Sequence, residues 1–358
     1  MAFDATDLSP HEQYVVDRIR NGDVADFTSM QGGKPAIRAG FLRRLMLQLE
    51  PDWAVRTPGV RLTGVRIEGA LDLTDCSGAG GAGLPALALV ECDIAEAVDV
   101  SHARLARLSL SGSRLARLVG AGAAIDGAAD ISHIAPAGAD GHESLTVILD
   151  GAQVGGDFAA NGAKLARPVE SVERALSMEN ARVGGSVVLN ASFEALGCVW
   201  LVGARIGASL QCGGGKFLNR TPDAKGAALV VENAEIAGAV LLCSGFAAEG
   251  EVRFEGARIN GGLVGSGAAF ICAAASTLAP ANVIVVMTMA SRRMGDGTRD
   301  RQSSASPASR PRAPRDHAEP GTPRPPPRRA DCATCATCEP ASQYPHRHHR
   351  ESRSPSSY

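Results

Sequence analysis

Aromatic side chains are scarce in this sequence. Only 4% of its 358 residues are Phe, Tyr or Trp, although 45% are hydrophobic and 41 are glycine. The core must therefore be built from Ala, Val, Leu and Ile, and the wide globular core that a chain of this length usually forms is not expected. The composition indicates a narrow interior.

The sequence also lacks segments that direct a chain into or across a membrane. Residues 1–7 contain no basic start followed by an apolar run, and the longest apolar stretch, residues 277–290, is interrupted by Pro280 and Asn282. Neither a secretory signal nor a membrane span is predicted. The nine cysteines are odd in number and unevenly spread, unlike the framework of a disulfide-rich secreted domain. We expect a cytoplasmic protein.

No charge of one sign dominates, because 36 Lys and Arg oppose 38 Asp and Glu to give a formal net charge of -2. Residues 291–358 contain 13 Arg, no Lys and seven acidic residues, a net charge of +6 that leaves -8 for residues 1–290. Direct nucleic-acid binding by this acidic body is not expected. Common catalytic motifs are missing too: residues 213–216, Gly-Gly-Gly-Lys, lack the spacing of a P-loop, and no Gly-x-Ser-x-Gly occurs.

What the sequence does contain is an internal repeat. Eight segments share a central Ile or Val, with a small or modest residue two positions before it and, in six of the eight, Gly two positions after it. The central residues are Ile67, Ile94, Ile125, Val154, Val183, Ile206, Ile236 and Ile259. The alternating pattern around them predicts short strands joined by small-residue corners. One circuit has four faces and about 23 residues, and alternate circuits carry an extra loop, at residues 166–175 and 219–227.

Residues 60–64, Val-Arg-Leu-Thr-Gly, and residues 65–69, Val-Arg-Ile-Glu-Gly, resemble the five-residue unit of the pentapeptide-repeat proteins. The looser unit at residues 203–207, Gly-Ala-Arg-Ile-Gly, is similar to that of a bacterial quasi-pentapeptide group, some members of which are named membrane-associated oxidoreductases. The resemblance covers residues 60–270 and implies an all-β fold, a right-handed quadrilateral parallel β-helix. It also implies a protein partner, because some pentapeptide-repeat proteins imitate duplex DNA and bind topoisomerases, and the acidic body is compatible with such a DNA-mimic interaction.

The N-terminal region, residues 1–56, is predicted to be a helical cap. Ser9, followed by Pro and then by Glu12, is a capping-box start for a helix that runs to Gly22. A second helix is predicted at residues 35–49, because the apolar residues there form one stripe. A cap of this kind would cover the first coil, whose strand edges would otherwise be exposed.

The β-helix is predicted to span residues 57–290, after which every periodicity stops. Residues 291–358 are rich in Pro, Ser and Arg, which predicts a disordered tail. Because the repeats stop in mid-pattern, we hypothesise that the tail is a frame-shifted or miscalled extension of a longer repeat protein; sequencing of the coding region would test this. Within it, Cys332, Cys335 and Cys338 have a spacing that suits zinc or part of an iron–sulfur cluster, but a fourth cysteine is lacking.

A candidate metal site follows from the repeat alignment. It brings like residues of successive coils onto one outward edge: Asp72, Asp99 and Asp130 five positions after the centres, and Asp75, His102 and His133 eight positions after them. Such ladders could bind a divalent metal, Ca²⁺ through the carboxylates or a transition metal through Asp and His. The alternative is structural, because Asp-x-Ser is typical of a polar strand that turns a corner. Both interpretations stay open on the sequence.

The sequence indicates architecture more than chemistry. We expect a non-enzymatic β-helical scaffold or protein-interaction module. One alternative is a metal-dependent or polysaccharide-acting enzyme that uses the face of Asp72, Asp99 and Asp130; another, implied by the family name alone, is a truncated membrane-associated oxidoreductase-like protein. Arginine recurs one position before four centres, at Arg66, Arg182, Arg205 and Arg258. This row favours a solvated face over a phosphate track.

Overall fold

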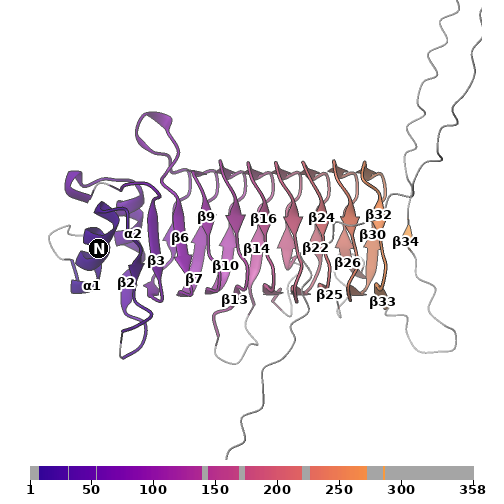
Figure 1. The fold of residues 1–358 in the computed structure, drawn as a ribbon, viewed down its shortest axis with the longest axis horizontal. Coiled ribbons are helices and arrows are strands. Elements are labelled where there is room, and N and C mark those ends of the chain that lie inside the picture. Colours follow the sequence, from indigo (N-terminus) through magenta and orange to yellow (C-terminus); the bar gives the residue numbers. More distant parts are fainter. Residues whose placement is uncertain are drawn as a thin grey trace, which may run out of the picture. The chain divides into compact units, whose positions relative to one another are not determined.

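The computed structural model describes residues 8–30, 32–53, 55–138, 144–168, 174–219, 226–271 and 285–286. In these residues, strands from successive circuits pair in parallel and build a β-solenoid of about eight turns, with two α-helices at its N-terminal end (Figure 1). The predicted four-sided parallel β-helix is therefore confirmed. The predicted tail at residues 291–358, with its cysteine string, lies outside the described residues.

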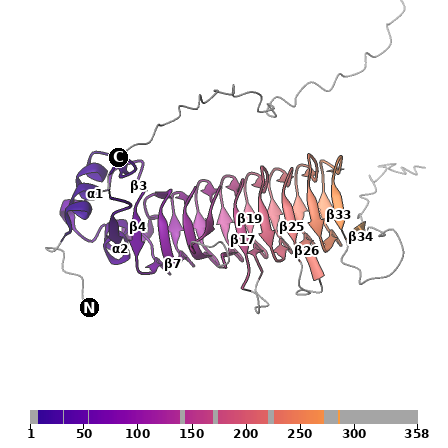
Figure 2. The same cartoon turned by 90° about the horizontal axis from the view of Figure 1, so that it is seen from below.

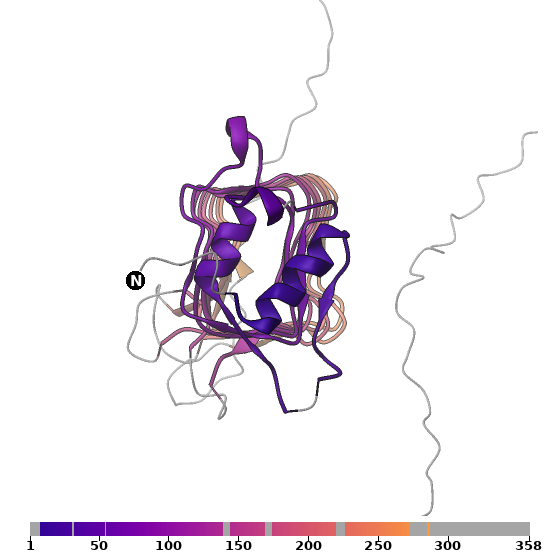
Figure 3. The same ribbon diagram turned by 90° about the vertical axis from the view of Figure 1, so that its left-hand side faces the viewer.

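Four parallel sheets form the sides of the solenoid, and Figure 3 shows them end-on as a square. We call the ten-stranded sheet face A, the twelve-stranded sheet face B, the seven-stranded sheet face C and the five-stranded sheet face D. In the later coils the chain passes from face B to C, then to A and D, before it returns to B. Each strand pairs with its counterparts one coil away, so the backbone hydrogen bonds run along the solenoid axis.

Faces A and C are built from short strands that alternate between buried and exposed side chains. The strands of face A are β1 (Ala25–Asp26), β3 (Val60–Thr63), β6 (Leu87–Val90), β9 (Leu108–Ser109), β12 (Ala129–Asp130), β16 (Phe158–Ala159), β20 (Val187–Val188), β24 (Leu210–Gln211), β28 (Val240–Leu241) and β32 (Leu263–Val264). The strands of face C are β8 (Arg104–Leu105), β11 (Ala124–Ile125), β15 (Gln153–Val154), β19 (Arg182–Val183), β23 (Arg205–Ile206), β27 (Glu235–Ile236) and β31 (Arg258–Ile259). On face C the first residue of each strand points outwards and the second points inwards.

Faces B and D complete the square. The strands of face B are β2 (Ala36–Arg38), β4 (Arg66–Glu68), β5 (Leu71–Asp72), β7 (Asp93–Asp99), β10 (Arg114–Val119), β13 (Ala135–Pro136), β14 (Thr146–Ile148), β18 (Leu176–Ser177), β22 (Val199–Trp200), β26 (Ala227–Val230), β30 (Glu251–Arg253) and β34 (Val285–Val286). The strands of face D are β17 (Lys164–Ala166), β21 (Glu194–Leu196), β25 (Lys216–Leu218), β29 (Ala247–Glu249) and β33 (Ala269–Ile271). Strand β10 is long because its first half pairs with β13, which contacts β17 of face D, and its second half pairs with β14.

The predicted repeat alignment is wrong by half a turn for the first two coils. Ile67 pairs with Ile94 in the first half of β7, whereas Ile125 pairs with Leu105 and Val154 on face C. The four sides of a coil share one pattern, an outward residue beside an inward apolar one. An alignment can therefore slip between sides without breaking the alternation of buried and exposed positions. From Ile125 onwards the predicted centres do share face C.

The two predicted loops are confirmed as interruptions between faces D and B. Strand β17 ends at Ala166 and β18 begins at Leu176, while β25 ends at Leu218 and β26 begins at Ala227. Residues 169–173 and 220–225, within these intervals, lie outside the described part of the chain.

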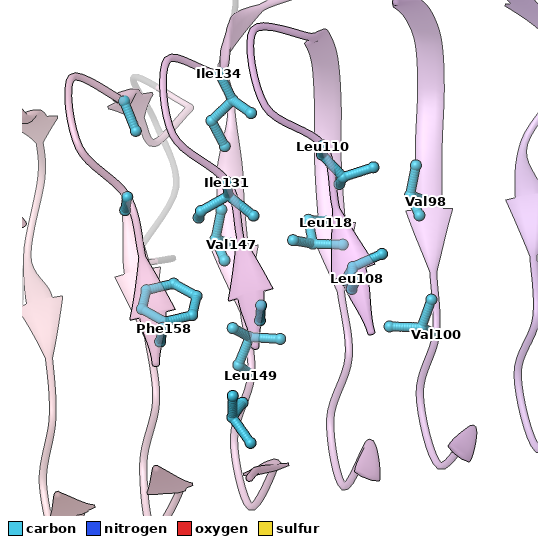
Figure 4. Packing of buried hydrophobic residues seen from close by; sticks show 14 of the residues in the cluster. Val98, Val100, Leu108, Leu110, Leu118, Ile131, Ile134, Val147, Leu149 and Phe158 are labelled. Atoms are coloured by element: carbon cyan, nitrogen blue, oxygen red, sulfur yellow. The ribbon is translucent and has the colours of Figure 1, made fainter. Parts of the chain in front are cut away.

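The interior is narrow and continuous, as the composition predicts. One hydrophobic cluster extends from Val15 in the first helix to Ala257, and Figure 4 shows Val98, Leu118 and Val147 of successive coils among its members. In the later coils one phenylalanine per coil forms a stack: Phe193, Phe217, Phe246 and Phe270, with ring centroids 5.3, 5.1 and 5.6 Å apart. Alanines lie directly opposite Phe217 on both neighbouring strands. The stacked rings thus share this side of the interior with small alanine side chains, as expected for a narrow core with few aromatic residues.

The first helix is α1 (Pro10–Arg20), as predicted. The side-chain oxygen of Ser9 accepts a hydrogen bond from the backbone N–H of Glu12 (3.2 Å), and the Glu12 carboxylate accepts one from the N–H of Ser9 (3.0 Å). The same carboxylate, only 1% exposed, accepts hydrogen bonds from Arg38 at 2.9 and 2.6 Å. The capping box therefore also attaches α1 to the strand that ends at Arg38.

The second helix is shorter than predicted: α2 (Ala39–Met46) replaces the helix expected at residues 35–49. The preceding residues form β2 instead, because they pair with β4, with Ile37 opposite Ile67. Pairing satisfies the edge of β4, which a helix would leave exposed. Both helices lie across the N-terminal end of the solenoid (Figures 2 and 3). Strands β1 and β2 belong to the solenoid sheets, so the cap and the first coil are continuous.

Candidate binding groove on face C

The predicted aspartate ladder is divided between two faces. Asp72 and Asp99 are directly paired on β5 and β7 of face B. Asp130 instead pairs with Ser109 and Ala159 on face A. The half-turn slip of the alignment is the cause, and the prediction of one shared Asp72, Asp99 and Asp130 face is wrong.

The predicted histidines also lie at different corners. Asp75 and His102 occupy the corner between faces B and C, whereas His133 follows Asp130 at the corner between faces A and D. All three have a left-handed backbone, with φ of 55°, 55° and 58°. Each imidazole lies over a glycine of the next coil: a Cβ on Gly122 would lie 2.6 Å from Nδ1 of His102, and one on Gly162 would lie 2.5 Å from Nδ1 of His133.

The aspartates act in the turns of the backbone. Each accepts a hydrogen bond from the backbone N–H two residues later: Asp72 from Thr74 (2.8 Å), Asp99 from Ser101 (2.8 Å) and Asp130 from Ser132 (2.9 Å). For Asp72 this hydrogen bond lowers the pKa of the carboxyl group, because it stabilises the charged form. The geometry favours the structural interpretation of the Asp-x-Ser pattern. Within the described ranges, no three His, Cys, Asp or Glu side chains form a group that could hold a metal ion.

A groove of about 1130 Å³ runs along face C over six successive coils. Its wall is the row of outward side chains at the first position of each strand, which we call the face C row: Ala124, Gln153, Arg182, Arg205, Glu235 and Arg258. Beside it lies the corner row, one residue after each strand: Asp126, Gly155, Gly184, Gly207, Ala237 and Asn260. The groove is therefore a repeating surface to which every coil contributes the same positions.

Glycine in the corner row makes the groove hollow. A Cβ on Gly155 would lie 2.1 Å from the carbonyl oxygen of Asp126, and one on Gly184 would lie 2.2 Å from that of Gly155. At Gly155 and Gly184 the coils stack too closely for a Cβ, so these two positions require glycine, whereas Ala237 of the same row is exposed and carries a side chain. The backbone amides are already occupied: the N–H of Gly184, for example, donates to the carbonyl oxygen of Val154 (2.8 Å). The polar groups that the groove leaves available are therefore the side chains of the face C row.

The charges along face C are compensated at both ends of the groove. Arg104, on the preceding coil, lies 3.3 Å from a carboxylate oxygen of Asp126. At the other end the Glu235 carboxylate lies between two arginines, 3.5 Å from Nε of Arg205 and 2.8 Å from the guanidinium group of Arg258. These arginines are exposed, as the sequence predicts.

The centre of the row is not compensated. Arg182 forms no ion pair or hydrogen bond with any residue in the described part of the chain. It lies directly opposite Arg205 on the next strand, an arrangement of like charges that is unfavourable. Face D shows the usual arrangement, because Lys164, Glu194 and Lys216 alternate in sign along its outer row. Arg182 is thus an exposed cation in the middle of the groove that has no partner within the described ranges.

A second polar cluster lies on face B, around Trp200. The Arg174 guanidinium lies 3.8 Å from the centre of the Trp200 ring and donates hydrogen bonds to Ser177 (3.1 Å) and Glu179 (3.0 Å). The indole N–H of Trp200 donates to the same Glu179 carboxylate (3.2 Å). These groups satisfy one another, which leaves the Trp200 ring covered by Arg174 rather than open to a ligand.

Five cysteines lie among the described residues. Cys76, Cys92, Cys198 and Cys212 are buried, Cys243 is half-buried, and all five are free thiols. Burial raises the pKa of Cys92 to about 11, so its reactive thiolate form is rare at neutral pH.

Comparison with known proteins adds no family: no family model, curated protein or solved structure matches this chain. The quasi-pentapeptide resemblance stays a prediction from the sequence. Among the described residues, neither helix has the length and apolar run that crossing a bilayer requires.

Proposed function

We propose that this chain is a non-enzymatic β-solenoid interaction module that binds an extended segment of a protein partner along the groove of face C. The observation that carries the proposal is the groove itself, which extends over six coils and repeats the same positions in each. A repeating wall suits a ligand that also repeats and runs parallel to the solenoid axis. An extended peptide is such a ligand.

The size of the groove supports a chain-like occupant. Pockets for small molecules have volumes of roughly 300–1,000 Å³ and enclose most of the ligand. The groove is larger, about 1130 Å³, and four of its six outward side chains are exposed: Gln153, Arg182, Arg205 and Arg258. This combination favours a peptide laid along the surface over an enclosed metabolite.

The side chains of the wall supply suitable hydrogen-bond donors. Gln153, Arg182 and Arg205 follow one another on three paired strands, and amide and guanidinium groups donate to the carbonyl and carboxylate oxygens of a peptide. The glycines of the corner row allow a ligand backbone to approach closely. Because the coils are held by backbone hydrogen bonds, the groove is preformed, and little ordering entropy is lost when a ligand binds.

Selection from a library of random twelve-residue peptides tests the proposal. Ala237 is exposed in the corner row of the groove, so Ala237→Trp should fill the groove without disturbing the core. Ala95→Trp is the matched control, because Ala95 is exposed on β7 and does not line the groove. We expect selected peptides whose binding is abolished by Ala237→Trp and kept by Ala95→Trp. Peptides that bind both variants as tightly as the unmodified chain would overturn the proposal.

A further inference from the structure

We infer that the groove is specific for an acidic peptide, one carboxylate of which binds between Arg182 and Arg205. This inference rests on the proposed function and adds the chemical class of the partner. Its basis is the uncompensated Arg182 and the direct pairing of Arg182 with Arg205 on β19 and β23.

An anion bound between Arg182 and Arg205 would complete the alternation of charge along the face C row. From Arg205 to Arg258 the row already alternates, because the Glu235 carboxylate contacts both arginines. A ligand carboxylate between Arg182 and Arg205 would extend the same order by one step. Adjacent coils are about 4.8 Å apart, and the long arginine side chains let both guanidinium groups reach one carboxylate, as forked donors commonly do.

Neighbouring positions also suit a peptide. Gln153, directly paired with Arg182, is a neutral amide that both donates and accepts hydrogen bonds. The Gln153 amide therefore suits the N–H and C=O groups of an extended peptide backbone more than it suits a second anionic group of the ligand. The glycine corner beside these residues, Gly155 and Gly184, lets the peptide backbone lie close to the wall.

A nucleic acid fits the groove less well. Proteins that bind single strands combine basic residues with aromatic side chains on which the bases stack, and the residues that line this groove include no aromatic one. Residues 1–290 also carry a net charge of -8, which repels a long polyanion. A short peptide carboxylate instead interacts mainly with charges within about 8–10 Å, the screening length at ordinary salt.

Fluorescence anisotropy with two labelled decapeptides tests the inference. In (Ser-Glu)₅ every glutamate lies on one side of an extended chain, and (Ser-Gln)₅ is its neutral equivalent. We expect the full chain to bind (Ser-Glu)₅ about tenfold or more tightly than (Ser-Gln)₅, because a hydrogen-bonded charge pair contributes at least that factor. Arg182→Gln should remove the preference, and higher salt should weaken it.

Arg66→Gln is the matched control, since Arg66 is an exposed strand residue outside the groove. It should leave the preference unchanged. Equal affinity for the two peptides, an equal loss in Arg66→Gln, or tighter binding of a labelled dT15 oligonucleotide would overturn the inference. If library peptides still bind in a manner that Ala237→Trp blocks, the groove function stands and only its acidic specificity fails. If neither probe nor library peptide depends on the groove, both fail.

Discussion

Arg182 and Arg205 are directly paired on the neighbouring strands β19 and β23, although both carry the same charge. Of this pair, only Arg205 contacts the Glu235 carboxylate, and Arg182 has no partner among the described residues. Like charges at directly opposed positions destabilise a sheet, so this pair lowers the stability of the free protein. A bound anion would offset the repulsion between the two arginines, so the proposed ligand should stabilise the protein.

The first prediction concerns this pair. Arg182→Glu should raise the free energy of unfolding by roughly 0.2–1 kcal/mol at low salt, because it replaces a repulsive pair with an attractive one. It should at the same time abolish (Ser-Glu)₅ binding. Thermal melts at low and high salt measure the gain, which should shrink as salt screens the charges. Glu194→Arg on face D is the converse control, because it lies between Lys164 and Lys216 and should destabilise.

The second prediction concerns the glycines of the corner row. Gly184→Ala should lower the free energy of unfolding by about 1–3 kcal/mol or more, because the new Cβ would lie 2.2 Å from the carbonyl oxygen of Gly155 and push two coils apart. Urea unfolding monitored by circular dichroism measures it. Gly40→Ala is the control: Gly40 lies in α2, a Cβ added there would meet no neighbouring atom within 4 Å, and alanine should stabilise the helix slightly. Equal effects at the two glycines would contradict the close stacking.

The third prediction concerns the turn aspartates. Asp99→Ala removes the carboxylate that accepts the N–H of Ser101, and should cost about 0.5–1.5 kcal/mol. The loss should be the same with and without added Ca²⁺, since the group serves the backbone. Paired thermal melts in calcium chloride and in chelator measure this. A loss of stability that appears only when Ca²⁺ is present would instead support the metal-binding interpretation.

The fourth prediction is a pH dependence at the cap. Burial raises the pKa of Glu12, but the hydrogen bonds from Arg38 and Ser9 outweigh it, so the pKa is lowered from its ordinary value of 4.5. Glu12 therefore contributes stability that is fully present above pH 4.5 and is lost as pH falls through its folded value. Glu12→Gln should destabilise by about 1–3 kcal/mol at pH 7. At acid pH the urea midpoint of the Glu12→Gln variant should approach that of the unmodified chain. A difference between the two midpoints that stays constant from pH 7 to 3 would contradict the stabilising role of the ionised Glu12 carboxylate.

Local rules in the sequence predicted much of the fold. The capping box at Ser9 and Glu12 can be recognised from four consecutive residues. The alternation of inward and outward side chains can be recognised within one short strand. The second helix was predicted too long because Ile37 fits a helical stripe as well as a strand. Only the exposed edge of β4, a feature of the folded coil, decides between them.

The register of the coils was harder to predict, and the candidate site depends on it. The four sides of each coil have the same pattern, so Asp72 and Asp130 look equivalent in sequence although they lie on different faces. The face C row was recognised as a solvated arginine row, but its groove was missed. The signal for it was the pair of glycines after Val154 and Val183, which marks a corner where coils stack without side chains.

Photo-crosslinking tests the central claim most directly. Benzoylphenylalanine placed at Ala124, an outward position at the end of the groove, should capture a library-selected peptide on illumination, and peptide mapping by mass spectrometry should locate the link in face C. The same group at Ala95 should capture none. Capture at Ala95 but not at Ala124 would show that the partner binds another face and would contradict the account.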